Sequence, residues 1–254
     1  RKRQLVIRDR ATVSPISLRP RPYSAQAPPA STQPSPANTF PPLHNAHTLP
    51  QPAISRTATA IIYCEGQFGD IDGKTANGLI RHSEKYTVLS VIDSTQAGLD
   101  TGMILDGTAN GIPVCRDMDD SLSQTATLPD FLIFGMAPAS GLLSEIQRDV
   151  VLAAMGKGMS IVNGLHEFLN DDPEFAAARI AHKVDIVDVR RPRPKKFLRM
   201  FSGSIHQVTC PRIAVLGTDC AIGKRTTATV LTAALNAIGL KAVLVGTGQT
   251  GLIQ

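Results

Sequence analysis

The chain has 254 residues, of which 43% are hydrophobic and 19% charged, values that suit a globular protein with one large core or two modest ones. Its formal charge of +5 is unevenly spread. Residues 1–56 hold eight Lys or Arg and one acid, so the remainder holds 18 basic against 20 acidic residues. Because the part expected to fold is slightly acidic, the charge pattern excludes a basic nucleic-acid-binding face, and we expect no nucleic-acid partner.

The four cysteines and the apolar runs exclude further classes. Cys64, Cys115, Cys210 and Cys220 lie far apart with no histidine at metal-ligand spacing, so neither a zinc site nor a disulfide framework is indicated, and we expect no metal centre. No apolar run reaches the roughly 18 residues that span a bilayer. We therefore expect a cytoplasmic protein without a membrane partner.

Residues 1–56 contain 11 of the 18 prolines and no sustained apolar periodicity. Such a segment cannot bury enough apolar surface to offset its ordering entropy, so we expect a disordered Pro/Ser/Arg-rich extension. Its composition also resembles an organellar transit peptide, although the prolines disfavour the amphipathic helix of such peptides. The chain begins with Arg1, and we expect it to be a fragment at this end.

Residues 57–192 alternate between short β-branched runs and helical stretches. The pattern predicts five buried parallel strands, over Ala58–Cys64, Tyr86–Asp93, Phe131–Gly135, Ser160–Gly164 and Val184–Val189. Between them, Ala139–Lys157 and Pro173–His182 have the periodicity of amphipathic helices. This alternation predicts an α/β domain with a Rossmann-like open parallel sheet.

Polar, glycine-rich loops follow all five predicted strands, and in an open α/β sheet these carboxyl ends line one ligand-binding crevice. Glu65, Asp93 and His166 are the candidates for a general base there. The candidates for substrate binding are Ser94, Thr95, Arg190 and Arg191, the two arginines as a clamp for a carboxylate. Each of these residues has an alternative role in a turn, in a helix cap or on a solvated surface.

A basic, proline-broken run, Arg190–Lys196, marks the boundary to a linker over residues 193–210 and a second domain from residue 211. There we predict a buried strand over Arg212–Gly217, a helix that ends at Gly239, and a strand over Ala242–Val245. A lone β-α-β unit leaves sheet faces and edges uncovered. We therefore expect residues 211–254 to be the opening of a truncated P-loop domain, marginal in isolation.

The segment between the first predicted strand and the helix has the features of a phosphate-binding loop. Glycines let backbone N–H groups surround an anion, the helix start adds positive potential, and a lysine adds a full charge. The predicted ligands of the phosphates are Gly217, Thr218, Asp219, Gly223, Lys224, Arg225, Thr226 and Thr227. Arg225 occupies the position of the usual magnesium-binding hydroxyl, so ATP with Mg²⁺ is one expected ligand and coenzyme A the other. The alternative to a phosphate-binding loop is that this glycine- and lysine-containing string occurs by chance.

Several blocks in the same order resemble the DgcN-like family, which was long catalogued as of unknown function and includes a D-glutamate N-acetyltransferase. They are Glu65–Gly69, Lys74–Gly78, Val91–Thr95, Gly164–Leu169, Asp188–Pro192, Gly217–Lys224 and Thr247–Gly251. The resemblance implies a Rossmann-like domain followed by a P-loop domain, with acetyl transfer from acetyl-CoA to the amino group of D-glutamate. It also implies substrate contacts at Gln249 and Thr250, a homo-oligomer, and a functional link to a racemase that acts on N-acetyl amino acids.

Two other functions remain open from the sequence. The loop is similar to that of dethiobiotin synthetase, which favours an ATP-dependent ligase or kinase. A nucleotide-binding sensor without turnover is the other alternative. Dependence of the product on acetyl-CoA or on ATP distinguishes these three hypotheses.

Overall fold

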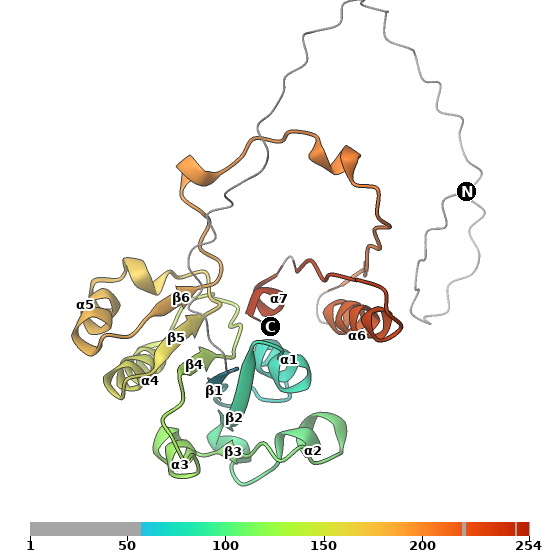
Figure 1. Ribbon diagram of the computed structural model, residues 1–254. Helices are drawn as coiled ribbons and strands as arrows, with labels where there is room; N and C mark the ends of the chain where they lie inside the picture. Colours follow the sequence, from blue (N-terminus) through green and yellow to red (C-terminus); the bar gives the residue numbers. More distant parts are fainter. Residues whose placement is uncertain (1–56, 220–221, 247, 254) are drawn as a thin grey trace, which may run out of the picture. The chain divides into compact units, whose positions relative to one another are not determined.

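The computed structural model describes residues 57–219, 222–246 and 248–253 (Figure 1). The predicted disordered extension, residues 1–56, lies outside the described residues. The rest of the chain divides into the sheet domain that the sequence predicts, a connecting segment, and the part that carries the phosphate-binding loop.

The first domain is one parallel sheet in the order β3-β2-β1-β4-β5-β6. Its strands are β1 (Ala58–Tyr63), β2 (Tyr86–Ile92), β3 (Val114–Cys115), β4 (Phe131–Phe134), β5 (Ser160–Asn163) and β6 (Ile186–Asp188). The five predicted strands are therefore confirmed, and β3 is an addition. This order is that of a dinucleotide-binding sheet, in which the chain starts in the middle, winds to one edge and then to the other.

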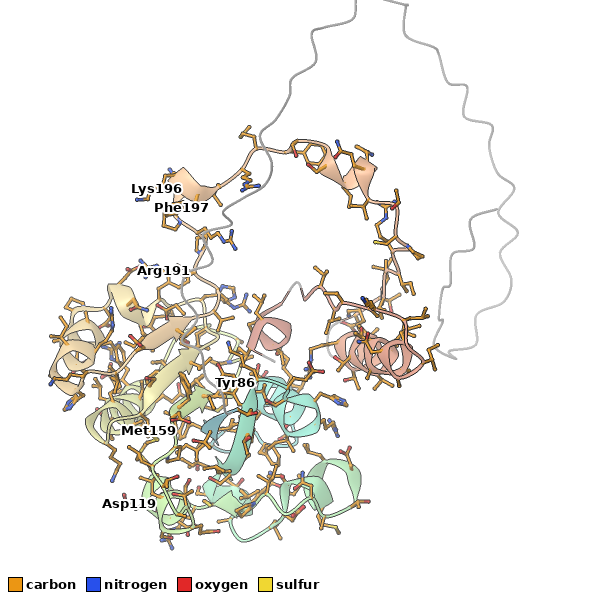
Figure 2. All side chains as sticks on the ribbon, viewed as in Figure 1. Tyr86, Asp119, Met159, Arg191, Lys196 and Phe197 are labelled. Atoms are coloured by element: carbon orange, nitrogen blue, oxygen red, sulfur yellow. The ribbon has the colours of Figure 1, made fainter. Side chains whose placement is uncertain are left out.

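The core lies on both faces of the central strands. Ile61, Ile62, Leu132 and Ile133 are fully buried, and register pairs Ile61 with Leu132 and Ile62 with Ile133. Burial of each such side chain contributes about 1.5–3 kcal/mol, which is why these strands are nearly continuous apolar runs. Figure 2 draws the surrounding side chains, with the buried Met159 among them.

Five helices connect the strands: α1 (Lys74–His82), α2 (Thr101–Asp106), α3 (Met118–Ser123), α4 (Glu145–Gly156) and α5 (Pro173–His182). Right-handed crossovers place α1 and α2 on one face of the sheet and α4 and α5 on the other, and each pair is in contact (Figure 1). The helix predicted from Ala139 begins only at Glu145, because Ser144 and Gln147 form a capping box there. Residues 139–144 are thereby left as a loop above the sheet.

The second part contains two helices, α6 (Lys224–Ala237) and α7 (Gln249–Ile253). The predicted stop of α6 is confirmed, since Gly239 follows with φ of 85°. The strands predicted over 212–217 and 242–245 are wrong: neither is a strand, and Leu216 and Val243 are more than 80% exposed. A strand exists only beside a hydrogen-bonded neighbour, and the described residues place none next to these two segments.

Candidate active site at the switch point of the sheet

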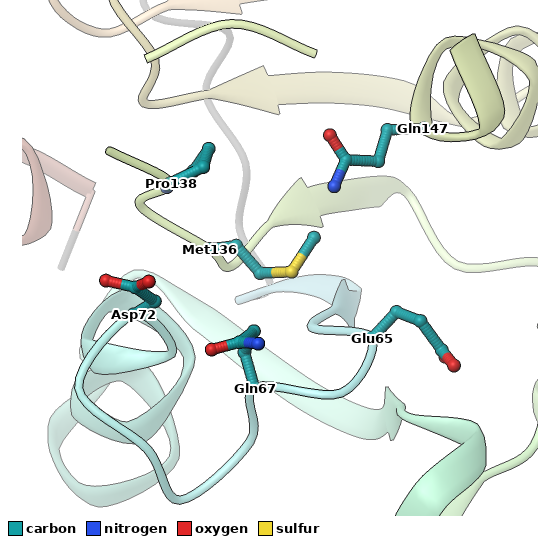
Figure 3. Close-up of a pocket in the computed structure, with 6 residues that line it drawn as sticks. All are labelled: Glu65, Gln67, Asp72, Met136, Pro138 and Gln147. Atoms are coloured by element: carbon teal, nitrogen blue, oxygen red, sulfur yellow. The ribbon is translucent and has the colours of Figure 1, made fainter. Parts of the chain in front are cut away.

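The strand order reverses between β1 and β4, and the loops that follow these two strands form the walls of a pocket of about 170 Å³ (Figure 3). At such a switch point neighbouring loops diverge, which opens a crevice at the carboxyl ends of the strands. The pocket is lined by Glu65, Gln67, Asp72, Met136, Pro138 and Gln147. It combines two carboxylates and two amides with an apolar floor.

Glu65 follows β1 directly and is half-buried in the pocket wall. Its carboxylate accepts hydrogen bonds from the backbone N–H of Ser94, at 2.9 Å, and from the Ser94 hydroxyl. The pKa of the neighbouring Tyr63 is raised to about 12, mainly because the side chain is buried. The negative charges of Glu65 and Asp93 raise it further. Glu65 is therefore a residue of the pocket lining whose carboxylate is positioned by Ser94.

Asp93 is completely buried one residue beyond β2, and its carboxylate accepts three hydrogen bonds. The donors are the backbone N–H of Phe68 at 3.0 Å, the backbone N–H of Thr95 at 3.0 Å and the Thr95 hydroxyl at 2.6 Å. These bonds tie the loop after β1 to the loop after β2. The structure thus brings Glu65, Asp93 and Thr95 together, with Asp93 as the buried tie between the loops.

His166 lies on the loop after β5, and its side chain is exposed. Its backbone N–H donates to the Gly141 carbonyl at 3.1 Å, and its ring lies so close to Gly141 that a Cβ there would overlap it. Gly141 also has φ of 70°, a left-handed backbone conformation that other residues rarely adopt. Among the described residues, His166 contacts this loop rather than Glu65 or Asp93.

The two predicted carboxylate-binding arginines point to different partners. Arg190 donates from Nε to the Gly164 carbonyl at 2.8 Å and from Nη2 to Oε1 of Gln249 at 2.5 Å. Arg191, labelled in Figure 2, instead pairs with Asp171 at 2.7 Å. Its guanidinium also lies over the ring of Phe168. Arg190 therefore stays at the crevice, whereas Arg191 is bound to the loop around α5.

Helix α7 carries the predicted contacts Gln249 and Thr250 onto the carboxyl edge of the sheet. The Thr250 hydroxyl lies 3.0 Å from the Thr75 hydroxyl at the start of α1, and both residues are buried. Ile253 is fully buried and lies against Gly164 at the end of β5. The segment that follows the phosphate-binding loop by sequence thus forms one wall of the crevice.

The loop itself retains the features of an anion site at the start of α6. Gly223, the residue before the helix, has φ of 88°, and the Lys224 ammonium group folds back to donate to the Asp219 carbonyl. Thr226 and Thr227 are half-buried in the first turn. A glycine with positive φ, a helix start and a lysine are the donor set that suits a phosphate group.

Arg225 turns away from this loop toward α1. Its guanidinium lies against Gly78, so closely that a Cβ on Gly78 would overlap it. Burial, followed by the charge of Arg81, lowers the pKa of Arg225. The side chain at the position of the usual magnesium-binding hydroxyl therefore contacts the first domain.

Sequence reasoning did not select most of the pocket. Gln67, Met136 and Pro138 lie in glycine-rich loops that the strand pattern located, but nothing in their spacing marks them as lining residues. Asp72 and Gln147 come from the start of a helix and from a capping box, for which the sequence carries no ligand signal. Across the described ranges there is no group of three metal-ligating side chains, and no helix there is long and apolar enough to cross a membrane.

Comparisons with known proteins agree with this two-part architecture. Residues 94–192 match the family model described as domain of unknown function DUF1611_N, a Rossmann-like domain, and residues 199–254 match the model of its C-terminal P-loop domain, DUF1611_C. A crystal structure of a DUF1611 family protein from Anabaena variabilis is 31% identical, with a TM-score of 0.69. That match covers 77% of this chain and 55% of the other.

Two relatives carry a functional name. A D-glutamate N-acetyltransferase from Tritonibacter scottomollicae is 32% identical over 127 residues, which are 48% of this chain and 35% of the relative. A protein of the same name from Pseudoalteromonas sp is 26% identical over 148 residues, which are 58% of this chain and 43% of the relative. The chain therefore spans less than half the length of either relative.

Proposed function

We propose that the chain acts as an N-acetyltransferase, on the premise that it belongs to the DUF1611 family, whose two models together match more than half of it. The reaction moves acetyl from acetyl-CoA to the amino group of D-glutamate or a similar amino acid. The names of the two relatives support this reaction class. Because those relatives are matched over part of their length, the substrates are part of the proposal.

One observation carries the proposal: helix α7, from the same part as the phosphate-binding loop, packs on the crevice beside a carboxylate-lined pocket. Acetyl transfer needs both parts of such an arrangement, an anchor for the phosphates of the donor and a base for the amine of the acceptor. Coenzyme A supplies the acetyl group as a thioester. Gly223, Lys224 and the start of α6 would hold its pyrophosphate.

Within the pocket, Glu65 takes the proton of the acceptor's ammonium group, so that the neutral amine can attack the acetyl carbon. The nitrogen loses a second proton as the tetrahedral intermediate collapses and the carbon–sulfur bond breaks. One of the two protons goes to the departing thiolate sulfur and the other to solvent, which gives the N-acetyl amino acid and free coenzyme A. Gln147 is the donor for the charge that develops on the acetyl oxygen, because its Oε1 already accepts from the Ser144 N–H at 2.9 Å, which leaves Nε2 to donate (Figure 3).

The charge of the pocket lining supports one orientation of the acceptor in this proposal. Its six lining residues include two carboxylates and no cation, so it suits the amine end of an amino acid and disfavours a carboxylate. The carboxylates of the acceptor then lie toward the loops after β5 and β6, where Arg190 is held beside Gln249.

The test is a thiol-release assay on the purified protein with acetyl-CoA and D-glutamate, in which the N-acetylated product is identified by mass spectrometry. We expect equal amounts of free thiol and N-acetyl product without added nucleotide. L-glutamate and D-aspartate are the comparison acceptors. Product formation that requires ATP would instead indicate a ligase or kinase.

A further inference from the structure

Helix α1 carries contacts to both helices of the P-loop part. Thr75, in its first turn, bonds to Thr250 of α7, and Gly78, one turn later, contacts Arg225 of α6. Residues three apart lie on the same face of a helix. One face of α1 therefore supports both the element that holds the loop and the element that walls the crevice.

Gly78 is the position on that face at which an added side chain would meet Arg225. It is buried in the interior of α1, where glycine is ordinarily unfavourable relative to alanine. A Cβ at this position would overlap Nη2, Cζ and Nη1 of the Arg225 guanidinium. Gly78 thus weakens its own helix, and Arg225 from the P-loop part occupies the space that a side chain at Gly78 would fill. Both features point to a docking role for this position.

The guanidinium of Arg225 lies within the electrostatic reach of Arg81 and His82. Burial and then Arg81 lower the pKa of Arg225, and burial followed by Arg225 and Arg81 lowers the pKa of His82. His82 is four residues beyond Gly78 and thus lies on the same face of α1. The guanidinium therefore rests along this face at some cost in charge repulsion, at the second residue of the helix that begins with Lys224.

We propose that the Thr75–Gly78 face of α1 is the docking face of the P-loop part, and that Gly78 is a positioning residue because it forms the seat for Arg225. In this arrangement Arg225 sets the position of α6, and with it Lys224, relative to the crevice, and it does not bind the phosphates of the ligand. The inference rests on the proposed function only in treating the loop as a phosphate site.

Gly78→Ala tests the seat without breaking α1. The overlapping atoms belong to the end of a flexible side chain, so Arg225 can move aside while the helix backbone stays. Alanine also favours the helix. Gly156→Ala, at the end of α4, is the matched control, because a Cβ there meets nothing closer than 4.0 Å. Arg225→Ala removes the clash, so Gly78→Ala should have no further effect in that background.

The first measurement is amide hydrogen exchange, followed by mass spectrometry, of the peptides that cover α7 and the start of α6. We expect faster exchange in Gly78→Ala and in Arg225→Ala, no additional change in the double variant, and wild-type exchange in Gly156→Ala. Wild-type exchange in Gly78→Ala, or additive effects in the double variant, would overturn the docking face.

The second measurement is calorimetric titration with coenzyme A and with ATP. We expect Gly78→Ala and Arg225→Ala to weaken binding equally, by about 2- to 30-fold, as for residues that couple two sites without touching the ligand. A much larger loss in Arg225→Ala than in Gly78→Ala would make Arg225 a phosphate ligand and overturn its positioning role. Lys224→Ala separates the two proposals: unchanged affinity there refutes the phosphate site, while the exchange experiment still decides the docking face.

Discussion

The hydroxyl of Thr75 lies 3.0 Å from the hydroxyl of Thr250, although 175 residues separate them in the sequence. Both side chains are buried, and together they join the start of α1 to the short helix α7. The contact therefore joins α7, which follows the phosphate-binding loop in the sequence, to the crevice at the carboxyl ends of the first strands.

The Thr75–Thr250 contact can be tested with a double-mutant cycle. Thr75→Val removes one hydroxyl and leaves the other buried without its partner, which costs about 1–3 kcal/mol in the free energy of unfolding. Thr75→Val/Thr250→Val removes both polar groups and should lie closer to wild type than the sum of the single changes. Urea denaturation measures this, with Thr87→Val on the exposed side of β2 as the control. Strict additivity would mean that the two hydroxyls do not interact.

Two carboxylates beside the crevice should respond differently to neutral substitution. Asp93→Asn turns an amide nitrogen toward backbone donors at a fully buried position, so we expect a loss of about 1–3 kcal/mol in stability. Glu65→Gln changes a half-buried pocket residue, and its effect on stability should be smaller. Chemical denaturation of both variants decides the point. A Glu65→Gln protein less stable than Asp93→Asn would reverse these assignments.

His82 should report the position of Arg225. Burial, Arg225 and Arg81 lower its pKa, against the opposing charge of Asp106, so it should titrate below its usual value near 6.5. Because the folded state then binds the proton less readily than the unfolded state, this group's contribution to stability is present above about pH 6.5 and declines as the pH falls toward the folded pKa. A histidine NMR titration should show a higher pKa in Arg225→Ala. An identical His82 pKa in both proteins would place Arg225 elsewhere.

Much of the first domain follows from local pattern. Strands such as β1 and β4 are buried β-branched or aromatic runs that end in glycine-rich loops, and both features are local. The strand β3 escapes detection because two residues, Val114 and Cys115, carry no periodicity. The segments 212–217 and 242–245 have the composition of strands, but composition cannot supply the hydrogen-bonded neighbour that a strand requires.

The site was only partly predictable for a related reason. Glu65 could be named because it follows a strand, and strand ends converge by topology. The contact of Arg225 with Gly78 depends on how two domains meet. The hydrogen bonding of the buried Asp93 depends in part on one donor 25 residues away, the backbone N–H of Phe68 in the loop after β1. Such long-range relationships leave no periodic signal in one sequence.

The central claim is a division of labour, in which the loop anchors the donor and the crevice performs the chemistry. Steady-state kinetics of acetyl transfer in Lys224→Ala and Glu65→Gln test it most directly. We predict that Lys224→Ala raises KM for acetyl-CoA on the order of tenfold with little change in kcat, because it removes a contact made equally before and during transfer. Glu65→Gln should lower kcat by about 10²- to 10⁴-fold with KM for acetyl-CoA unchanged. An unaltered KM in Lys224→Ala, or full kcat in Glu65→Gln, would contradict the account.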